Sequence, residues 1–89
     1  MKLVCKVKVK NALGLHTRPA AAIVKLLQPH KASVSFTYKN ETINARSIMS
    51  ILMLAAKKNT QIIITVEGVD AELAMRRLIA VFEEEFGEK

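Results

Sequence analysis

The sequence predicts a two-layer α+β domain in which helices cover one face of a mostly antiparallel sheet. Four segments are patterned as strands, two stretches repeat apolar residues at helical spacing, and a third, "SIMSILMLAAKK", is an apolar run too long for a typical strand. Their order along the chain is βαββαβα, with one hairpin and no internal repeat, which is typical of this class. The length of 89 residues and the hydrophobic fraction of 51% suit a single domain over residues 1–89.

An alternating pattern predicts the first strand over residues 2–10, with lysines on its solvated face. The apolar face of this strand consists of Leu3, Cys5, Val7 and Val9. After a loop at 11–14, apolar residues at i, i+3, i+4 and i+7 predict the first helix, and they are Ala20, Ile23, Val24 and Leu27. This helix ends before Pro29, because the residue that precedes a proline is pushed out of the α region.

The next two strands are expected to form a hairpin. Val34, Phe36 and Tyr38 alternate with small polar residues, and a shorter extended piece carries Thr42 and Ile43. Between them, Asn40 is expected to adopt the positive φ that a tight turn demands, because asparagine accepts that conformation more readily than most residues.

A second, short helix is expected to begin at Ser47, a preferred N-cap residue. Its core-facing residues are predicted to be Ile51, Leu54 and Ala55. Ile48, Met49 and Leu52 are then left on another side. Lys57 and Lys58 are expected to supply cations at the end of this helix, and Asn59 to take the left-handed cap.

The last strand and the last helix complete the order. Ile62, Ile64 and Val66 form a core-facing row in "QIIITVEG", and Gly68 turns the chain. Asp70 is predicted to cap a helix whose buried stripe consists of Ala71, Ala74, Met75, Leu78 and Phe82.

Composition sets limits on the class of protein. A single cysteine, Cys5, excludes an internal disulfide and suits a reducing compartment, so we expect a cytoplasmic protein. Lysines interrupt the N-terminal apolar pattern, and no apolar run approaches the roughly 20 residues of a membrane span, so we expect no signal peptide and no membrane insertion. The net charge of +6 permits acidic partners.

The stretch "GLHTRPA" places His16 where a loop enters the first helix. Pro19 lies in the first turn, where its missing N–H costs nothing. The backbone amides of Thr17 and Arg18 are then unpaired donors at the positive end of the helix dipole, and Arg18 adds a guanidinium suited to phosphate oxygens. Because these positive groups disfavour a charged imidazole, we expect His16 to be a neutral nucleophile beside an anion site.

Two stretches carry a family resemblance over essentially the whole chain. "GLHTRPAA" and "INARSIMSILML" resemble the signatures of HPr, the histidine-containing phosphocarrier of the bacterial phosphoenolpyruvate-dependent sugar phosphotransferase system. The resemblance implies an open-faced β-sandwich, with an antiparallel sheet of strand order 1-4-2-3 and three helices on one face. It also implies that phosphorylated enzyme I phosphorylates His16 on Nδ1, that IIA proteins receive the phosphoryl group, and that Arg18 steadies it.

The resemblance assigns further residues to regulation and to partner binding. Ser47 matches the serine that HPr kinase/phosphorylase modifies in many bacteria, and regulators then bind the serine-phosphorylated form. The surface that docks enzyme I and IIA corresponds to Thr17, Ala21, Arg46, Ile48, Met49 and Leu52. Arg46 replaces the usual lysine before the serine. The family commonly has glycines at the positions of Asn40, Ala55 and Asn59.

Two alternatives stay open beside the sugar-system carrier. One is an HPr-like regulatory paralogue in a nitrogen-type or incomplete phosphotransferase chain. The other is a basic nucleic-acid-binding module, which the few aromatic residues disfavour, since Phe36 and Tyr38 belong to the predicted core row. We expect a monomeric covalent carrier rather than a freestanding enzyme, with no cofactor and no metal. His30, after Pro29, is interpreted as a loop residue.

Overall fold

The computed structural model describes residues 1–89, and the predicted element order is confirmed. The strands are β1 (Lys2–Lys8), β2 (Ser33–Tyr38), β3 (Glu41–Asn44) and β4 (Gln61–Glu67). The helices are α1 (Thr17–Leu27), α2 (Ile48–Leu54) and α3 (Ala71–Glu83), followed by a short 3-10 helix, η1 (Glu85–Gly87). The strands form one antiparallel sheet of order β1-β4-β2-β3, as the family resemblance implies.

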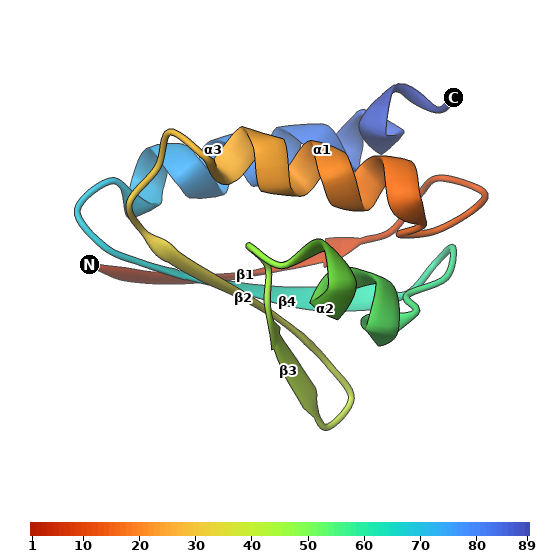
Figure 1. The fold of residues 1–89 in the computed structure, drawn as a ribbon, viewed down its shortest axis with the longest axis horizontal. Coiled ribbons are helices and arrows are strands. Elements are labelled where there is room, and N and C mark those ends of the chain that lie inside the picture. Colours follow the sequence, from red (N-terminus) through yellow and green to blue (C-terminus); the bar gives the residue numbers. More distant parts are fainter.

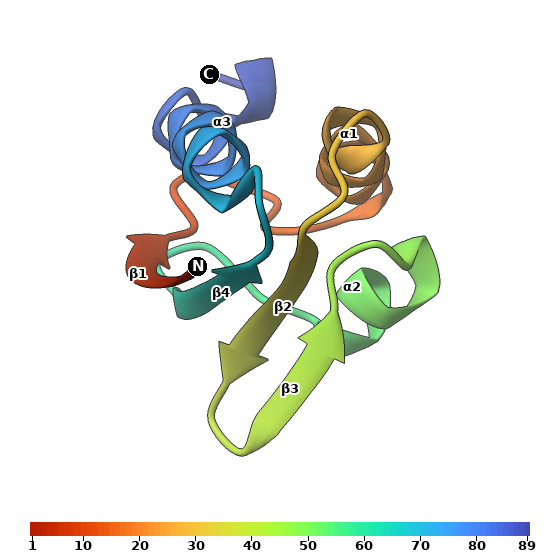
Figure 2. The ribbon, with the colours of Figure 1, turned by 90° about the vertical axis from the view of Figure 1, so that its left-hand side faces the viewer.

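The three helices lie on one side of the sheet, and the opposite face is open (Figures 1 and 2). Helices α1 and α3 run side by side over the sheet, and α2 is a shorter piece that follows the β2–β3 hairpin. No helix is both long enough and apolar enough to cross a membrane. The strands are patterned accordingly, since one row of each strand contacts the helices and the other faces solvent.

The core between the two layers contains 21 buried apolar residues. The predicted core-facing rows of the two central strands, β2 and β4, are confirmed. Their fully buried residues include Phe36, Ile62, Ile64 and Val66. The predicted stripe of α3 is buried along its whole length. Phe82 of this stripe packs edge-on against Phe36, with 5.9 Å between the ring centroids, and this contact joins α3 to the sheet.

Several local predictions are wrong. β1 ends at Lys8 rather than at residue 10, although the Val9 amide still donates to the Thr60 carbonyl. The positive φ of the hairpin falls on Lys39 rather than on Asn40. The left-handed cap of α2 is the exposed Ala55, which was expected to face the core. Asn59 has the predicted positive φ, at 71°, but it lies beyond the end of the helix.

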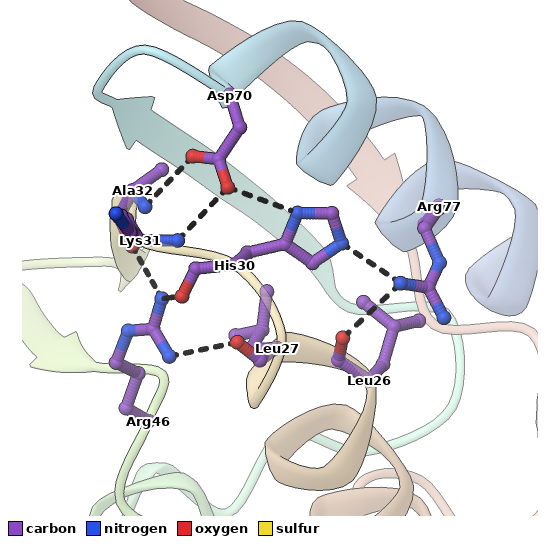
Figure 3. A network of polar contacts seen from close by, with 8 residues as sticks. All are labelled: Leu26, Leu27, His30, Lys31, Ala32, Arg46, Asp70 and Arg77. Carbon is purple, nitrogen blue, oxygen red and sulfur yellow. Dashed lines mark hydrogen bonds and ion pairs between the residues drawn. The ribbon is translucent and has the colours of Figure 1, made fainter.

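Asp70 precedes α3 as predicted, but its side chain caps no helix amide. Its carboxylate instead accepts hydrogen bonds from the backbone amides of Lys31 and Ala32, at 2.8 and 2.9 Å. The same carboxylate contacts the buried ring of His30 (Figure 3). His30 is thus part of a polar network between α1, β2 and α3, which the sequence reasoning missed.

Candidate functional site

His16 is the N-cap residue of α1, as the loop-to-helix interpretation predicts. Its backbone is extended, and its carbonyl accepts the first helical hydrogen bond from Ala20. About one third of its side chain is exposed, so the imidazole is neither packed in the core nor free in solvent. This position gives a reacting group access to the ring while the helix start fixes the main chain.

Hydrogen-bond donors without partners surround this helix start. The amides of Thr17 and Arg18 make no hydrogen bond within the protein, and the side chain of His16 does not cap them. Arg18 is exposed and forms no ion pair. A tetrahedral anion beside His16 could therefore accept hydrogen bonds from two amides and a guanidinium, at the positive end of an 11-residue helix.

The loop before His16 is held against the segment that follows α2. The amide of Leu15 donates to the carbonyl of Ala56 at 2.9 Å. Gly14 has a φ of +68°, and a Cβ built on it would lie 2.3 Å from the same carbonyl oxygen. Only glycine fits at position 14 without a shift of the backbone. Packing against Ala56 therefore requires a glycine two residues before the histidine.

The carboxylate of Glu88, which the sequence reasoning missed, contacts the imidazole of His16. Glu88 Oε2 is 2.7 Å from His16 Nε2, and Glu88 Oε1 accepts from the Nδ2 group of buried Asn11 at 2.9 Å. The site therefore contains negative charge as well as the predicted positive groups. The sequence holds no signal for this contact, because the burial of Asn11, which requires a partner for its amide, is evident only in the structure.

The predicted partner residues lie on two neighbouring helices. Thr17 and Ala21 are exposed on α1. On α2, Ile48 and Met49 are 39% and 68% exposed, Met53 adds a further exposed apolar side chain, and Leu52 is partly buried against the core. The exposed apolar side chains of α2 thus lie on an element that packs against α1, the helix that His16 caps.

Ser47 is the N-cap of α2, as predicted, and its Oγ accepts from the amide of Ser50 at 3.2 Å.

Arg46, which was expected on the partner surface, has its guanidinium hydrogen-bonded within the protein. Its guanidinium donates to the carbonyls of Leu27, His30 and Ala32, which ties the β3–α2 connection to the end of α1 (Figure 3).

Two surface pockets are present. The smaller one lies beside the histidine site, between the 12–13 loop, Arg18 and residues 87–89. The larger one lies on the open face of the sheet and is lined by polar residues of the strands, such as Ser35 and Thr65. The lining of the smaller pocket includes Arg18 and Glu88, which both neighbour His16.

The chain is a small open-faced α+β sandwich with a partly exposed histidine at a helix start, next to an arginine and free amides, which is the arrangement expected of a histidine-containing phosphocarrier. Residues 4–84 match the family model described as the phosphotransferase system HPr component phosphorylation site. The chain therefore belongs to the HPr family.

Individual relatives agree with this assignment. The chain is 45% identical over 80 residues to the phosphocarrier protein HPr of Chlamydia muridarum. The matched stretch covers 90% of this chain and 77% of that protein. The crystal structure of HPr-C-His from Thermoanaerobacter tengcongensis matches 98% of both chains, with a TM-score of 0.93 and 32% identity. A phosphocarrier HPr structure from Bacillus anthracis matches with a TM-score of 0.84 and 38% identity, over 89% of this chain and 94% of that one.

Proposed function

We propose that this protein carries a phosphoryl group on Nδ1 of His16, received from phosphorylated enzyme I and passed on to IIA proteins. The observation that carries the proposal is the imidazole at the start of α1 beside donors that have no partner in the protein. The amides of Thr17 and Arg18 and the Arg18 guanidinium would hold the phosphoryl oxygens. Stabilising both the transferring and the attached group in this way lets phosphoryl transfer run in either direction.

The apolar surface of Ile48, Met49 and Leu52 is the proposed docking site for both partners. Methionine adapts its shape to different surfaces, which suits a carrier that must bind a donor and an acceptor in turn. The surplus of basic residues, +6 over the chain, would steer acidic partners to this surface and let them leave quickly.

The experiment that tests the carrier role uses enzyme I, phosphoenolpyruvate and the full chain. We expect an acid-labile, base-stable phosphate that maps to His16 and is absent from His16→Ala. The other histidine supplies the control, because buried His30 should remain unlabelled in the same digest. A label that persists in His16→Ala, or that maps to His30, would overturn the assignment.

A second, regulatory role is proposed for Ser47. Its hydroxyl lies at the start of α2, next to exposed Ile48 and Met49, so a phosphate there would add negative charge to the proposed docking surface. Incubation with HPr kinase and ATP should give an acid-stable label that Ser47→Ala lacks and His16→Ala retains. The absence of any acid-stable label on the folded chain would exclude this role for that kinase.

A further inference from the structure

The Glu88 carboxylate is held at both of its oxygens. Oε2 lies 2.7 Å from Nε2 of His16, and Oε1 accepts from Nδ2 of Asn11 at 2.9 Å. The same Nδ2 group donates to the carbonyl of Gly14 at 2.7 Å, so Asn11 is itself fixed to the loop that precedes the histidine. Only 11% of the Glu88 side chain is exposed. This is an enclosed contact rather than a surface ion pair.

The backbone reaches this position through an unfavourable conformation. Glu85, Phe86 and Gly87 all have positive φ, at 55°, 55° and 73°, and two of the three are not glycine. Such a run is retained only where surrounding contacts offset its cost. The ring of Phe86 packs edge-on against Phe82 at 5.0 Å, which anchors the turn on the core and directs Glu88 back toward His16. Figure 1 shows this end of the chain above the start of α1.

The contact determines which ring nitrogen carries the proton. An ionised carboxylate only accepts hydrogen bonds, so Nε2 of His16 must be the protonated nitrogen in this pair. In the neutral ring the lone pair then lies on Nδ1. That nitrogen makes no hydrogen bond within the protein, although it belongs to the N-cap residue of α1. It is left as the only nucleophilic atom of the ring.

We propose that Glu88 is a positioning residue for phosphoryl transfer. It keeps the ring proton on Nε2, so that Nδ1 meets the phosphorus, and it offsets the charge that the ring acquires. This inference rests on the proposed carrier function of His16.

The step balances without any further reactant. The Nδ1 lone pair forms the N–P bond while the bond between phosphorus and the donor breaks, and its electron pair stays with the donor. The proton remains on Nε2, and the ring becomes a cation that faces the Glu88 carboxylate. A carboxylate that orients a histidine and stabilises its cationic form is a recurring arrangement in enzymes that use histidine.

The opposite role for Glu88 makes the opposite prediction. A carboxylate near the site also repels an incoming phosphoryl group, and if that effect dominated, neutralising it would speed transfer. The two roles are therefore separated by the direction of the rate change in Glu88→Gln.

The test compares the full chain with Glu88→Ala and Glu88→Gln, with Glu84→Gln as the matched control. Glu84 is exposed, four residues away, and forms no ion pair. Rapid-quench phosphorylation by enzyme I and phosphoenolpyruvate should show a kcat about tenfold lower in Glu88→Ala, as expected for the loss of a hydrogen bond to a charged group. KM for the carrier should change little, because the α2 surface is untouched. Circular dichroism checks that each variant is folded.

Nitrogen-15 NMR of the His16 ring supplies a readout that a purely structural role would not move. In the unaltered chain the two ring nitrogens should give well separated signals, with the proton on Nε2. In Glu88→Ala the two signals should approach each other as the tautomers mix. An unchanged or faster rate would overturn the role of Glu88 in transfer, and unchanged ring signals would overturn its effect on the tautomer.

The two proposals fail in different ways. If the unaltered chain takes no label on His16, the carrier function fails. If it is labelled and both Glu88 variants match it in rate, only the role of Glu88 fails. The NMR measurement needs no phosphoryl donor, so it tests the hold of Glu88 on the ring in either case.

Discussion

Arg77 donates a hydrogen bond from Nη1 to Nε2 of His30, with 2.8 Å between the two nitrogens. A guanidinium has no acceptor, so Nε2 of His30 must carry a lone pair and the ring proton must be on Nδ1. Nδ1 lies 3.2 Å from the Asp70 carboxylate. His30 is therefore neutral in this network, between a cation on α3 and an anion at the start of the same helix (Figure 3).

This arrangement predicts how stability depends on pH through Asp70. The amide of Lys31 lowers the pKa of Asp70 below its ordinary value of 3.8 against an opposing effect of burial, and the amide of Ala32 and the His30 ring lower it further. A lowered pKa in the folded state means that ionised Asp70 stabilises the fold above 3.8, and that this contribution is lost as the pH falls through the folded value.

We therefore expect Asp70→Asn to be less stable than the unaltered chain near neutral pH, and the difference to shrink in acid. Urea unfolding of both proteins, at pH values from neutral to well below 3.8, measures this difference in the free energy of unfolding. Glu84→Gln, which removes an exposed carboxylate, is the control and should run parallel to the unaltered chain. A difference between Asp70→Asn and the unaltered chain that stayed constant down to the most acidic conditions would contradict the network.

The cap at Ser47 gives a second prediction. Ser47→Ala should lower the free energy of unfolding by about 1 kcal/mol, because the amide of Ser50 loses its acceptor at the start of α2. Ser50→Ala is the matched control, since Ser50 contributes only its backbone amide to this bond and alanine favours a helix interior. Equal unfolding midpoints for the two variants would show that the cap contributes nothing.

The end of α2 gives a third prediction, of opposite sign. Ala55 has φ 55° and ψ 39°, a left-handed conformation that costs a residue with a Cβ roughly 1 kcal/mol. Ala55→Gly should therefore stabilise the protein by about this amount in thermal or urea unfolding. The same substitution at exposed Ala21 inside α1 should destabilise it by about 1 kcal/mol. A loss of stability at both positions would contradict the assigned backbone conformation.

The α2 surface gives a fourth prediction. Met49 is 68% exposed, so Met49→Lys should leave the unfolding free energy unchanged. If this surface docks enzyme I, the KM for the carrier should rise by about tenfold, since an apolar contact at the centre of an interface is worth 1 kcal/mol or more. Val69→Lys places the same charge at a 94% exposed site between β4 and α3, and its KM should match the unaltered chain. Equal effects of the two variants would point to net charge instead of docking.

The sequence alone was sufficient for the element order and for most of the core. Local periodicity reports which face of a segment is apolar, and this is why Ile23, Ile64 and Leu78 were assigned to the core and are fully buried. The cap at Ser47 was also predictable, because a cap depends on residues three positions apart.

Polar contacts between distant segments were not predictable in this way. His16 and Glu88 are 72 residues apart, and His30 and Asp70 are 40 apart, so no local pattern links them. Left-handed positions were predicted only in part, since Asn59 has the expected positive φ of 71° but Asn40 does not. Asparagine tolerates positive φ most easily, but the pairing of the strands and the length of α2 put that conformation on Lys39 and Ala55.

The hydrogen bond from Leu15 to Ala56 has a consequence for recognition. It locks the peptide that carries the imidazole to the peptide that leaves α2, and the missing side chain of Gly14 lets the two run in contact. The ring of His16 and the exposed methionines of α2 are thereby held in one spatial relationship. If the α2 surface is the docking site proposed above, a donor and an acceptor that contact the methionines would both meet the ring at the same distance, and each would need the same spacing between its own apolar patch and its phosphoryl-bearing atom.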